Sequence, residues 1–279
     1  MKNNQEELKS NMESGRLTVV GCGLHPGHMT SESESYISKA DKVLVVAPNP
    51  LSIQHIRGLN PCAENLGLLY EGDVNRLQTY HMMAEKMVEL VLEGYDVCCV
   101  FYGHPGIFAL SPHLAIEKLK TLGKPAKMLP GISADACLFA DLNQDPATVG
   151  CQSFEATQFL LTERPVDPSS ALILWQVGLT AEHTLKERKP GKHGISALIR
   201  LLRNYYSEQH KVCVYEAPML PGFEHREDWV TLNELETIEL NTISTLYIPA
   251  EQPMKFAKER LEWLKLEESD LSAWKLAKS

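Results

Sequence analysis

The sequence places an arginine between two tyrosines at a spacing that suits acid–base chemistry. Arg76 and Tyr80 are four residues apart, so a helix that begins before Arg76 would carry both on one face, with Tyr70 in the preceding loop. A guanidinium beside a phenol favours the phenolate and lowers the pKa of the phenol. It can also stabilise negative charge that develops on a substrate oxygen. The three residues are a candidate oxyanion or proton-transfer site, and the competing interpretation is an ordinary solvated helix start.

A second candidate is the turn at 102–106, which reads Tyr-Gly-His-Pro-Gly. It follows the strand-like run 96–101 and precedes a helix-like run from about Ser111 to Leu122. In open parallel sheets, ligands bind outside the carboxyl ends of the strands, where such turns lie. Its glycines let the backbone approach a ligand with no Cβ in the way. We expect this turn to hold a ligand.

The first glycine loop, at 21–27, matches neither of the common nucleotide motifs. Its spacing departs from the dinucleotide pattern GxGxxG, and the Gly-Lys-Ser/Thr of a Walker-type phosphate loop is absent. His25 and His28 lie three apart, but no cysteine or carboxylate completes a tetrahedral set at a recognised spacing. We therefore expect no metal site. His104, within its Gly-Pro turn, is expected to fix loop geometry or to touch a ligand.

The elements that must position these residues alternate between strand and helix, which is typical of a mostly parallel sheet covered by helices. In the first half, strands are predicted at 17–20, 42–47, 96–101 and 126–129, and helices from near Thr30 and over 77–93, 111–122 and 134–140. In the second half, strands are predicted at 150–154, 171–176, 211–216 and 243–248, with helices near 155–161 and 194–206 and a loop at 186–193.

The length of 279 residues fits two modest domains better than one, and 141–150 reads as a linker. The sequence predicts an α/β protein of two domains with mostly parallel or mixed sheets. The expected divisions are a disordered tail at 1–16, an N-terminal domain at 17–145, a C-terminal domain at 146–250 and a charged helical tail at 251–279.

The composition excludes several classes of protein. A net charge of −9 and a pI near 5.6 argue against a general nucleic-acid binder. No apolar run approaches the ~18 residues of a membrane span, and the N-terminus lacks the apolar segment of a signal peptide. The seven cysteines form no regular framework and are expected to be reduced thiols in a cytoplasmic protein.

Three motifs together resemble the tetrapyrrole methylase superfamily, the class III S-adenosylmethionine (SAM) methyltransferases. They are GCG…PG…MT at 21–30, YGHPGIF at 102–108 and LPGISA at 129–134, and they occur in the order and spacing of that family. The resemblance covers about residues 17–250. Two departures stand out, because His25 is inserted where the family usually has Gly-Pro-Gly, and His104 replaces the aspartate common in porphyrin and corrin methylases.

A second set of motifs is similar to the borosin branch, whose members methylate backbone amide nitrogens of a ribosomally made peptide. The set consists of His104, QSFEA at 152–156, LWQ at 174–176, EHT at 182–184 and YEAP at 215–218. The cluster of Tyr70, Arg76 and Tyr80 also fits the catalytic group of that branch. The resemblance thus favours the functional interpretation of the cluster over the solvated helix start.

The resemblance implies that SAM is the cofactor, bound in the cleft between two domains and released as S-adenosylhomocysteine. Lining residues implied for the first domain are Tyr102, Gly103, His104, Ile107, Phe108, Ser133 and Ala134. Those implied for the second domain are Gln176, Tyr215, Ala217 and Thr245. The first loop, 21–27, is then expected to border the methyl acceptor and not the cofactor.

The implied acceptor is a poor nucleophile, because the amide lone pair is delocalised into the carbonyl. In the reaction that the resemblance implies, Arg76 stabilises the amide oxygen and Tyr80 or Tyr70 takes the N–H proton. The resemblance also implies a homodimer whose subunits wrap around each other. Since 260–279 is charged and not apolar, we expect the substrate to be a separate precursor peptide acting in trans.

Two other functions stay open at this point. A small-molecule methylase acting on a porphyrin- or corrin-like ring needs the same turns but no Tyr-Arg-Tyr cluster. A catalytically silent SAM-binding protein needs the turns alone.

Overall fold

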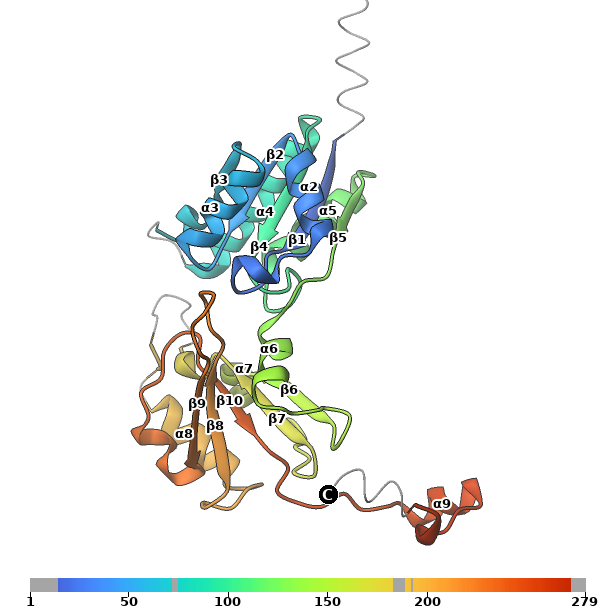
Figure 1. Ribbon diagram of the computed structural model, residues 1–279. Helices are drawn as coiled ribbons and strands as arrows, with labels where there is room; N and C mark the ends of the chain where they lie inside the picture. The colour runs from blue at the N-terminus through green and yellow to red at the C-terminus, as the bar shows by residue number, and fades with distance from the viewer. Residues whose placement is uncertain (1–14, 72–74, 183–188, 192, 272–279) are drawn as a thin grey trace, which may run out of the picture. The chain divides into compact units, whose positions relative to one another are not determined.

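The structure, a computed structural model, describes residues 15–71, 75–182, 189–191 and 193–271. The chain divides into two compact units, each described here by itself (Figure 1). Unit 1 comprises residues 1–137 and 217–224, and unit 2 comprises 138–216 and 225–279. The division therefore falls inside a helix, eight residues before the predicted boundary at 145/146, and a short segment from the second half of the chain belongs to unit 1.

Unit 1 is built on a parallel five-stranded sheet with the order β3-β2-β4-β1-β5. Its strands are β1 (Arg16–Gly21), β2 (Lys42–Val46), β3 (Ala63–Asn65), β4 (Asp96–Phe101) and β5 (Ala126–Met128). The three central strands are buried almost throughout. Their runs of valine, leucine and cysteine are typical of parallel strands that are covered on both faces.

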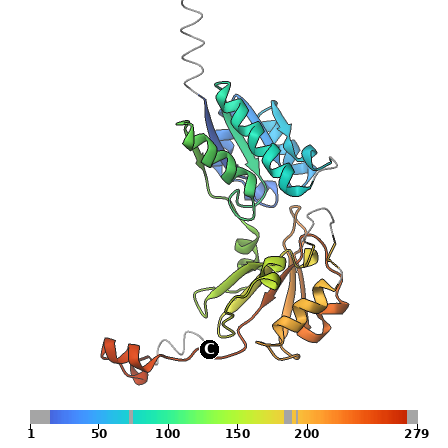
Figure 2. The ribbon, with the colours of Figure 1, turned by 180° about the vertical axis from the view of Figure 1, so that it is seen from behind.

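Helices cover the two faces of this sheet in pairs (Figures 1 and 2). On one face, Ile37 of α2 (Ser31–Lys39) and Ile56 of α3 (Pro50–Leu59) pack with Cys98 and Val100. On the other, α4 (Arg76–Leu92) and α5 (Leu110–Thr121) bury Met83 and Leu119 against the alternate residues of the same strands. The sides alternate along β4 because successive strand residues point to opposite faces.

Side-chain caps fix where three of these helices begin. The Thr30 hydroxyl accepts a hydrogen bond from the Ser33 amide at 3.1 Å, and the Asn49 side chain caps α3 in the same way. The Asn75 Oδ1 atom accepts from the Gln78 amide at 2.9 Å, so α4 begins at Arg76. Such caps satisfy amides that have no partner within the helix. The last cap sets the orientation of the predicted catalytic cluster.

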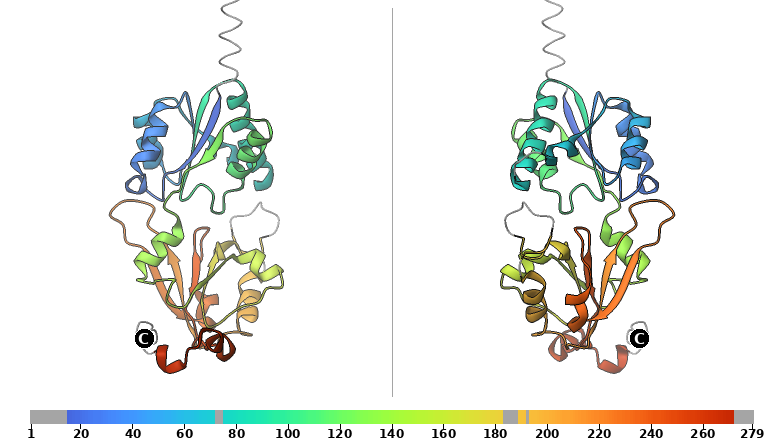
Figure 3. Two further views of the ribbon diagram at one scale, coloured as in Figure 1. Left: turned by 90° about the vertical axis from the view of Figure 1, so that its right-hand side faces the viewer. Right: turned by 90° about the vertical axis from the view of Figure 1, so that its left-hand side faces the viewer.

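Unit 2 contains a mixed five-stranded sheet with the order β6-β7-β10-β8-β9. Its strands are β6 (Cys151–Glu155), β7 (Ala171–Trp175), β8 (Lys211–Glu216), β9 (Arg226–Thr231) and β10 (Thr245–Ile248). Only β6 and β7 pair in parallel, and the other pairs are antiparallel. Helices α7 (Ala156–Leu161) and α8 (Gly194–Leu202) pack against this sheet around a second core (Figure 3). In the sequence, α6 (Ala134–Asp141) precedes the first strand of the sheet and α9 (Lys258–Leu264) follows the last.

Short 3-10 helices complete the chain. They are η1 (Pro26–His28), η2 (Leu66–Glu71), η3 (Val177–Leu179), η4 (Leu232–Thr237) and η5 (Glu268–Leu271).

The two-domain α/β fold with parallel and mixed sheets is as predicted, but three of the α-helices and strands were not predicted. Helix α3 starts with a proline, β3 has three residues, and β9 reads Arg-Glu-Asp-Trp-Val-Thr. A proline suits the first turn of a helix, where its missing N–H leaves no gap in the hydrogen bonding. The charges of β9 suit its position at the edge of the sheet. None of these three elements has the apolar pattern on which the strand and helix predictions rest.

The chain ends test the predicted tails only in part. Strand β1 already begins at Arg16, and residues 1–14 lie outside the described part. The predicted helix at 194–206 ends at Leu202, and most of the predicted loop at 186–193 lies outside the described residues. Within the described part of 251–279, helical structure is confined to α9 and η5. No helix among the described residues is both long and apolar enough to cross a membrane.

Candidate functional site in unit 1

The two glycine turns singled out from the sequence lie next to each other in unit 1. Strands β1 and β4 are neighbours in the sheet. After β1 the chain goes to β2, toward one edge of the sheet, and after β4 it goes to β5, at the opposite edge. In open α/β sheets, a ligand-binding crevice forms where connections from adjacent strands diverge in this way. The turns at 22–28 and 102–106 therefore occupy the edge of the sheet where a ligand is expected.

Glycines from all three motifs meet at this edge. A Cβ added to Gly21 would lie 2.4 Å from the Gly103 carbonyl oxygen, and one added to Gly131 would lie 2.7 Å from the same atom. Gly23 and Gly103 form an isolated β-bridge, with the Gly103 amide donating to the Gly23 carbonyl at 2.8 Å. Gly21 and Gly131 are thus needed so that three turns can approach one another, a reason additional to approach by a ligand.

Gly103 is required for a different reason. Its φ is +65°, and among the described residues, apart from its two chain neighbours, no atom lies within 4 Å of the position that a Cβ would take. The left-handed backbone favours glycine, while the space above the residue is open. Gly123, which follows α5, has the same combination with φ +69°. The two glycines make a matched pair, because an alanine at either strains the backbone without a clash.

The turn after β4 presents apolar side chains to solvent. Tyr102, Ile107 and Phe108 are 48%, 42% and 54% exposed. Phe108 also has a φ of 51°, in the left-handed region that a bulky residue rarely adopts. Such a conformation costs ~1–3 kcal/mol and is found most often at ligand sites. These features suit a surface that an apolar ligand group covers.

His104 and Ser133 are held by local hydrogen bonds. The His104 Nδ1 atom accepts from the Gly106 amide at 3.0 Å, so the neutral ring carries its proton on Nε2 and can donate it to a ligand. Ser133 is buried directly before α6, and its hydroxyl hydrogen-bonds to the carboxylate of Asp135 in the first turn of that helix. Ala134 is the first residue of α6. These positions are compatible with the cofactor roles predicted for them.

The predicted catalytic cluster assembles in unit 1. The rings of Tyr70 and Tyr80 meet edge to face with centroids 6.2 Å apart, so that the two phenols interact with each other. Arg76 and Tyr102 both lie close enough to act electrostatically on Tyr70. Sequence reasoning placed Tyr102 only against the cofactor, whereas the structure also joins it to this cluster. The sequence held a signal for this second role, because Tyr102 directly follows the strand-like run 96–101 and so lies at the edge of the sheet where ligands bind.

The charge state of Tyr70 differs from the expectation that Arg76 would lower its pKa. Burial raises the pKa of Tyr70 well above its ordinary value, the phenols of Tyr80 and Tyr102 raise it further, and Arg76 offsets this only in part. The pKa of Tyr102 is also raised, by desolvation around its hydroxyl group although about half of the residue is exposed, with a further contribution from Tyr80. Desolvation disfavours a phenolate more than one guanidinium favours it here. Tyr70 is therefore a neutral hydrogen-bond donor at physiological pH.

Helix α4 presents the cluster at the end of its buried face. Arg76 and Tyr80 share a helix face with the fully buried Met83 and Met87. Arg76 is the first residue of the helix, and no acid lies in the first turn. A cation there opposes the helix dipole at a cost of ~0.3–1 kcal/mol. Helix electrostatics alone therefore does not favour an arginine at this position.

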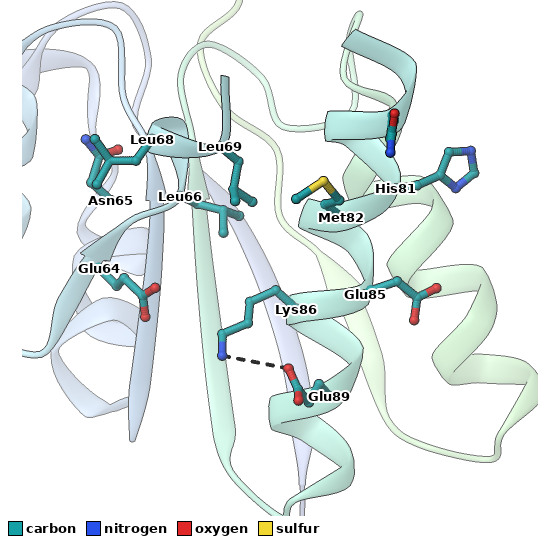
Figure 4. A pocket seen from close by; sticks show the side chains of 11 residues that line it. Glu64, Asn65, Leu66, Leu68, Leu69, His81, Met82, Glu85, Lys86 and Glu89 are labelled. Atoms are coloured by element: carbon teal, nitrogen blue, oxygen red, sulfur yellow. Dashed lines mark ion pairs between the residues drawn. The ribbon is translucent and has the colours of Figure 1, made fainter. Parts of the chain in front are cut away.

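The opposite face of α4 borders a groove of about 570 Å³ (Figure 4). Its walls include Leu66, Leu69 and Met82, and Lys86 forms an ion pair with Glu89 at 3.7 Å along it. Residues 78, 82, 85 and 89 of the helix line this groove, about half a turn away from Arg76 and Tyr80. The groove is therefore separate from the predicted catalytic cluster.

Three of the cofactor residues predicted for the second half lie together in unit 2. Tyr215 on β8 pairs with Thr245 on β10, and the amide after Gln176 donates to the Ser244 carbonyl at 3.0 Å. Tyr215 and Thr245 are only 1% and 3% exposed, and the Tyr215 phenol donates to Asp141 at 2.6 Å. Gln176 has a left-handed φ of 57°. Ala217 belongs to unit 1.

The fold of the two units is that of class III methyltransferases. It is similar to a cobalamin biosynthetic enzyme, cobalt precorrin-4 methyltransferase, with a TM-score of 0.60 at 16% identity over 88% of this chain and 98% of that one. Uroporphyrin-III-C-methyltransferase from Thermus thermophilus gives 0.59 at 16% identity over 85% and 92%. Residues 16–224 match the family described as Tetrapyrrole (Corrin/Porphyrin) Methylases, and the chain belongs to this family.

Among sequence relatives are fungal proteins that combine two functions in one name. A methyltransferase/ribosomally synthesized cyclic peptide gymnopeptides precursor of Gymnopus fusipes is 38% identical over 94% of this chain. The corresponding omphalotin A precursor of Omphalotus olearius is 38% identical over 87%. A type III borosin cyclic peptide precursor of Anomoporia bombycina is 35% identical over 87%. The chain spans 64%, 60% and 29% of the lengths of these relatives.

Proposed function

We propose that this chain is a SAM-dependent borosin-type methyltransferase that N-methylates backbone amides of a separate precursor peptide. The observation that carries the proposal is the cluster of Tyr70, Arg76 and Tyr80 beside Tyr102, the first residue of the predicted cofactor turn. The names of the fungal relatives support a peptide as the acceptor. We expect the protein to act as a homodimer. We also expect the peptide that it methylates to be separate from α9 and η5, because the sequences of both are charged.

The residues of unit 1 fit the cofactor. The open space above Gly103 and the exposed side chains of Tyr102, Ile107 and Phe108 suit a ligand with an apolar face. The Nε2–H group of His104 can donate to a polar ligand atom. When bound, SAM supplies an electrophilic methyl group on a sulfonium. In unit 2, Tyr215 and Thr245 are buried and pair with each other across β8 and β10.

In this proposal, the protein residues make the amide nitrogen nucleophilic. Arg76 stabilises negative charge on the amide oxygen while the N–H proton leaves. In this proposal Tyr80 reacts as its phenolate, takes that proton directly or through water, and becomes the neutral phenol. The neutral Tyr70 donates its hydrogen bond to Tyr80, which stabilises charge on the Tyr80 oxygen. The new N–C bond forms as the S–C bond breaks, and the proton ends on the base.

Matched glycine variants test the cofactor site. Gly103→Ala and Gly123→Ala impose the same left-handed strain, and neither added methyl group meets an atom from other parts of the described chain. Only the first fills the space assigned to SAM, so we expect it to weaken SAM binding at least about tenfold in calorimetry, with similar thermal stability in both variants. Equal SAM affinity in the two variants would place the cofactor elsewhere.

The acceptor is tested by mass spectrometry. The test peptide is synthetic, with alternating valine and glycine flanked by lysines. Incubated with the enzyme and SAM, it should gain mass in steps of ~14 Da, because each methylation replaces N–H by N–CH₃. The enzyme with SAM alone should gain none. Methylation of a porphyrin- or corrin-like ring instead of the peptide would favour the small-molecule alternative, and absence of turnover with both would favour a silent binder.

A further inference from the structure

The first glycine loop carries two histidines whose rings lie against each other. The ring centroids of His25 and His28 are 3.7 Å apart and the planes are tilted by 41°. His25 caps the 3-10 helix η1, His28 ends it, and both are half-buried. Neither residue has a role in the mechanism above. His25 also stands at the point where the loop departs from the family pattern.

Backbone hydrogen bonds fix the tautomer of both rings. The Nδ1 atom of His25 accepts from the Gly27 amide at 3.2 Å, and that of His28 accepts from the Leu24 amide at 3.4 Å. An Nδ1 atom that accepts carries no proton, so each neutral ring bears its proton on Nε2. The Nε2 atom of His25 has no hydrogen-bond partner among the residues that the structure describes. His25 therefore offers a fixed N–H donor that the loop itself does not use.

The loop is tied to the turn that the proposed function assigns to the cofactor. Gly103 donates to Gly23 at 2.8 Å, and Gly23 donates back at 3.3 Å. A Cβ at Gly23 would lie 2.1 Å from the His28 Cβ, so the ring pair packs directly on this bridge. The pair thus sits on the same edge of the sheet as Tyr102. The His25 donor is held in place by the tilted contact with the His28 ring and by the backbone hydrogen bond, which lowers the entropy lost when it binds a partner.

We propose that the His25 Nε2–H group hydrogen-bonds a main-chain carbonyl oxygen of the acceptor peptide and so positions its amides. This inference rests on the proposed function. A neutral donor suits a neutral carbonyl, and a carbonyl acceptor suits an enzyme that must read backbone and not side chains. His25 is a positioning residue here, since it donates to a carbonyl and exchanges no proton with the reacting nitrogen.

Two substitutions separate the two nitrogens of the ring. In His25→Asn, the side-chain oxygen can replace Nδ1 as the cap of the Gly27 amide, but the distal donor is lost. In His25→Gln, the longer side chain can place its NH₂ near the position of Nε2. We expect His25→Asn to raise the KM for the valine–glycine peptide about tenfold, with kcat and SAM affinity nearly unchanged. His25→Gln should recover most of that loss.

The control is His55→Asn, which alters a histidine of α3 that pairs with Glu34. It should leave KM unchanged. Wild-type KM in His25→Asn, or a larger loss in His25→Gln than in His25→Asn, would overturn the role of His25. A wild-type enzyme that methylates no peptide would instead refute the proposed function, and this inference with it.

Discussion

Some of the predicted cofactor residues lie in opposite environments in the two units. In unit 1, Tyr102, Ile107 and Phe108 expose about half of their surface at the turn after β4. In unit 2, Tyr215 and Thr245 are buried, and the Tyr215 phenol is already bonded to Asp141. The side chains of these three residues of unit 1 are thus exposed where a ligand is expected, whereas those of Tyr215 and Thr245 are not. In the proposed function, this difference assigns recognition of the ligand to side chains of unit 1 and a supporting role to unit 2.

One feature is common to both units. Phe108 in unit 1 and Gln176 in unit 2 hold left-handed backbone conformations at predicted cofactor positions. Backbone strain of this kind persists only where the surrounding structure enforces it. The two units therefore differ in the exposure of these side chains, and both contain a strained backbone position.

The largest expected effect tests whether unit 1 separates chemistry from cofactor binding. Arg76→Ala and Tyr80→Phe should slow single-turnover methylation of the peptide by at least ~100-fold, the scale of one lost oxyanion donor or general base. SAM affinity measured by calorimetry should stay nearly intact. Arg76→Lys should recover only part of the rate, because an ammonium keeps the charge but loses the planar fork. Near-wild-type rates in both variants would return the cluster to an ordinary helix start.

A smaller effect tests the contrast between the units directly. Tyr102→Ala removes an exposed ring in unit 1 and should weaken SAM binding about tenfold. Tyr215→Phe keeps the ring in unit 2 but removes the hydrogen bond to Asp141. It should lower the free energy of unfolding by about 1 kcal/mol and leave SAM affinity within about twofold. If Tyr215→Phe weakens SAM binding more than Tyr102→Ala does, the proposed division of roles is wrong.

The sequence predicted the fold of both units because their strands are short apolar runs bounded by turn residues. The window 96–101 coincides with β4, and the helix predicted at 77–93 differs from α4 by one residue at each end. Strand β9 was missed because an edge strand is stabilised by pairing and its charges hide it. Tertiary context overrides local pattern there.

The candidate site was predictable in its parts but not in its electrostatics. Spacing placed Arg76 and Tyr80 on one face, as the structure has them. No spacing rule gives the burial of Tyr70, and burial decides the direction of its pKa. Nor could the sequence show that Gly21 and Gly131 pack on Gly103, since contacts between distant turns depend on the order of strands in the sheet.

The smallest expected effect tests whether unit 2 is a well-satisfied support. The Tyr206 hydroxyl is buried with no hydrogen-bond partner in the described part of the chain, whereas the Tyr247 hydroxyl bonds to Gln144 at 3.0 Å. Tyr206→Phe removes an unsatisfied polar group and should raise the free energy of unfolding at pH 7 by about 1 kcal/mol. Tyr247→Phe breaks a bond and should lower it by a similar amount. Urea unfolding of both variants measures the difference.

The same pair responds to alkaline pH in a defined direction. Burial raises the pKa of Tyr206 and that of Tyr247 from 10 to about 12, with smaller contributions from nearby acids and thiols. A group that holds its proton more tightly when folded contributes stability that is present below pH 10 and is lost as the pH rises toward 12. Each phenylalanine variant should therefore lose less stability than the wild type between pH 10 and 12. If both variants lose as much as the wild type over that range, neither phenol is buried as described, and unit 2 is looser than its core indicates.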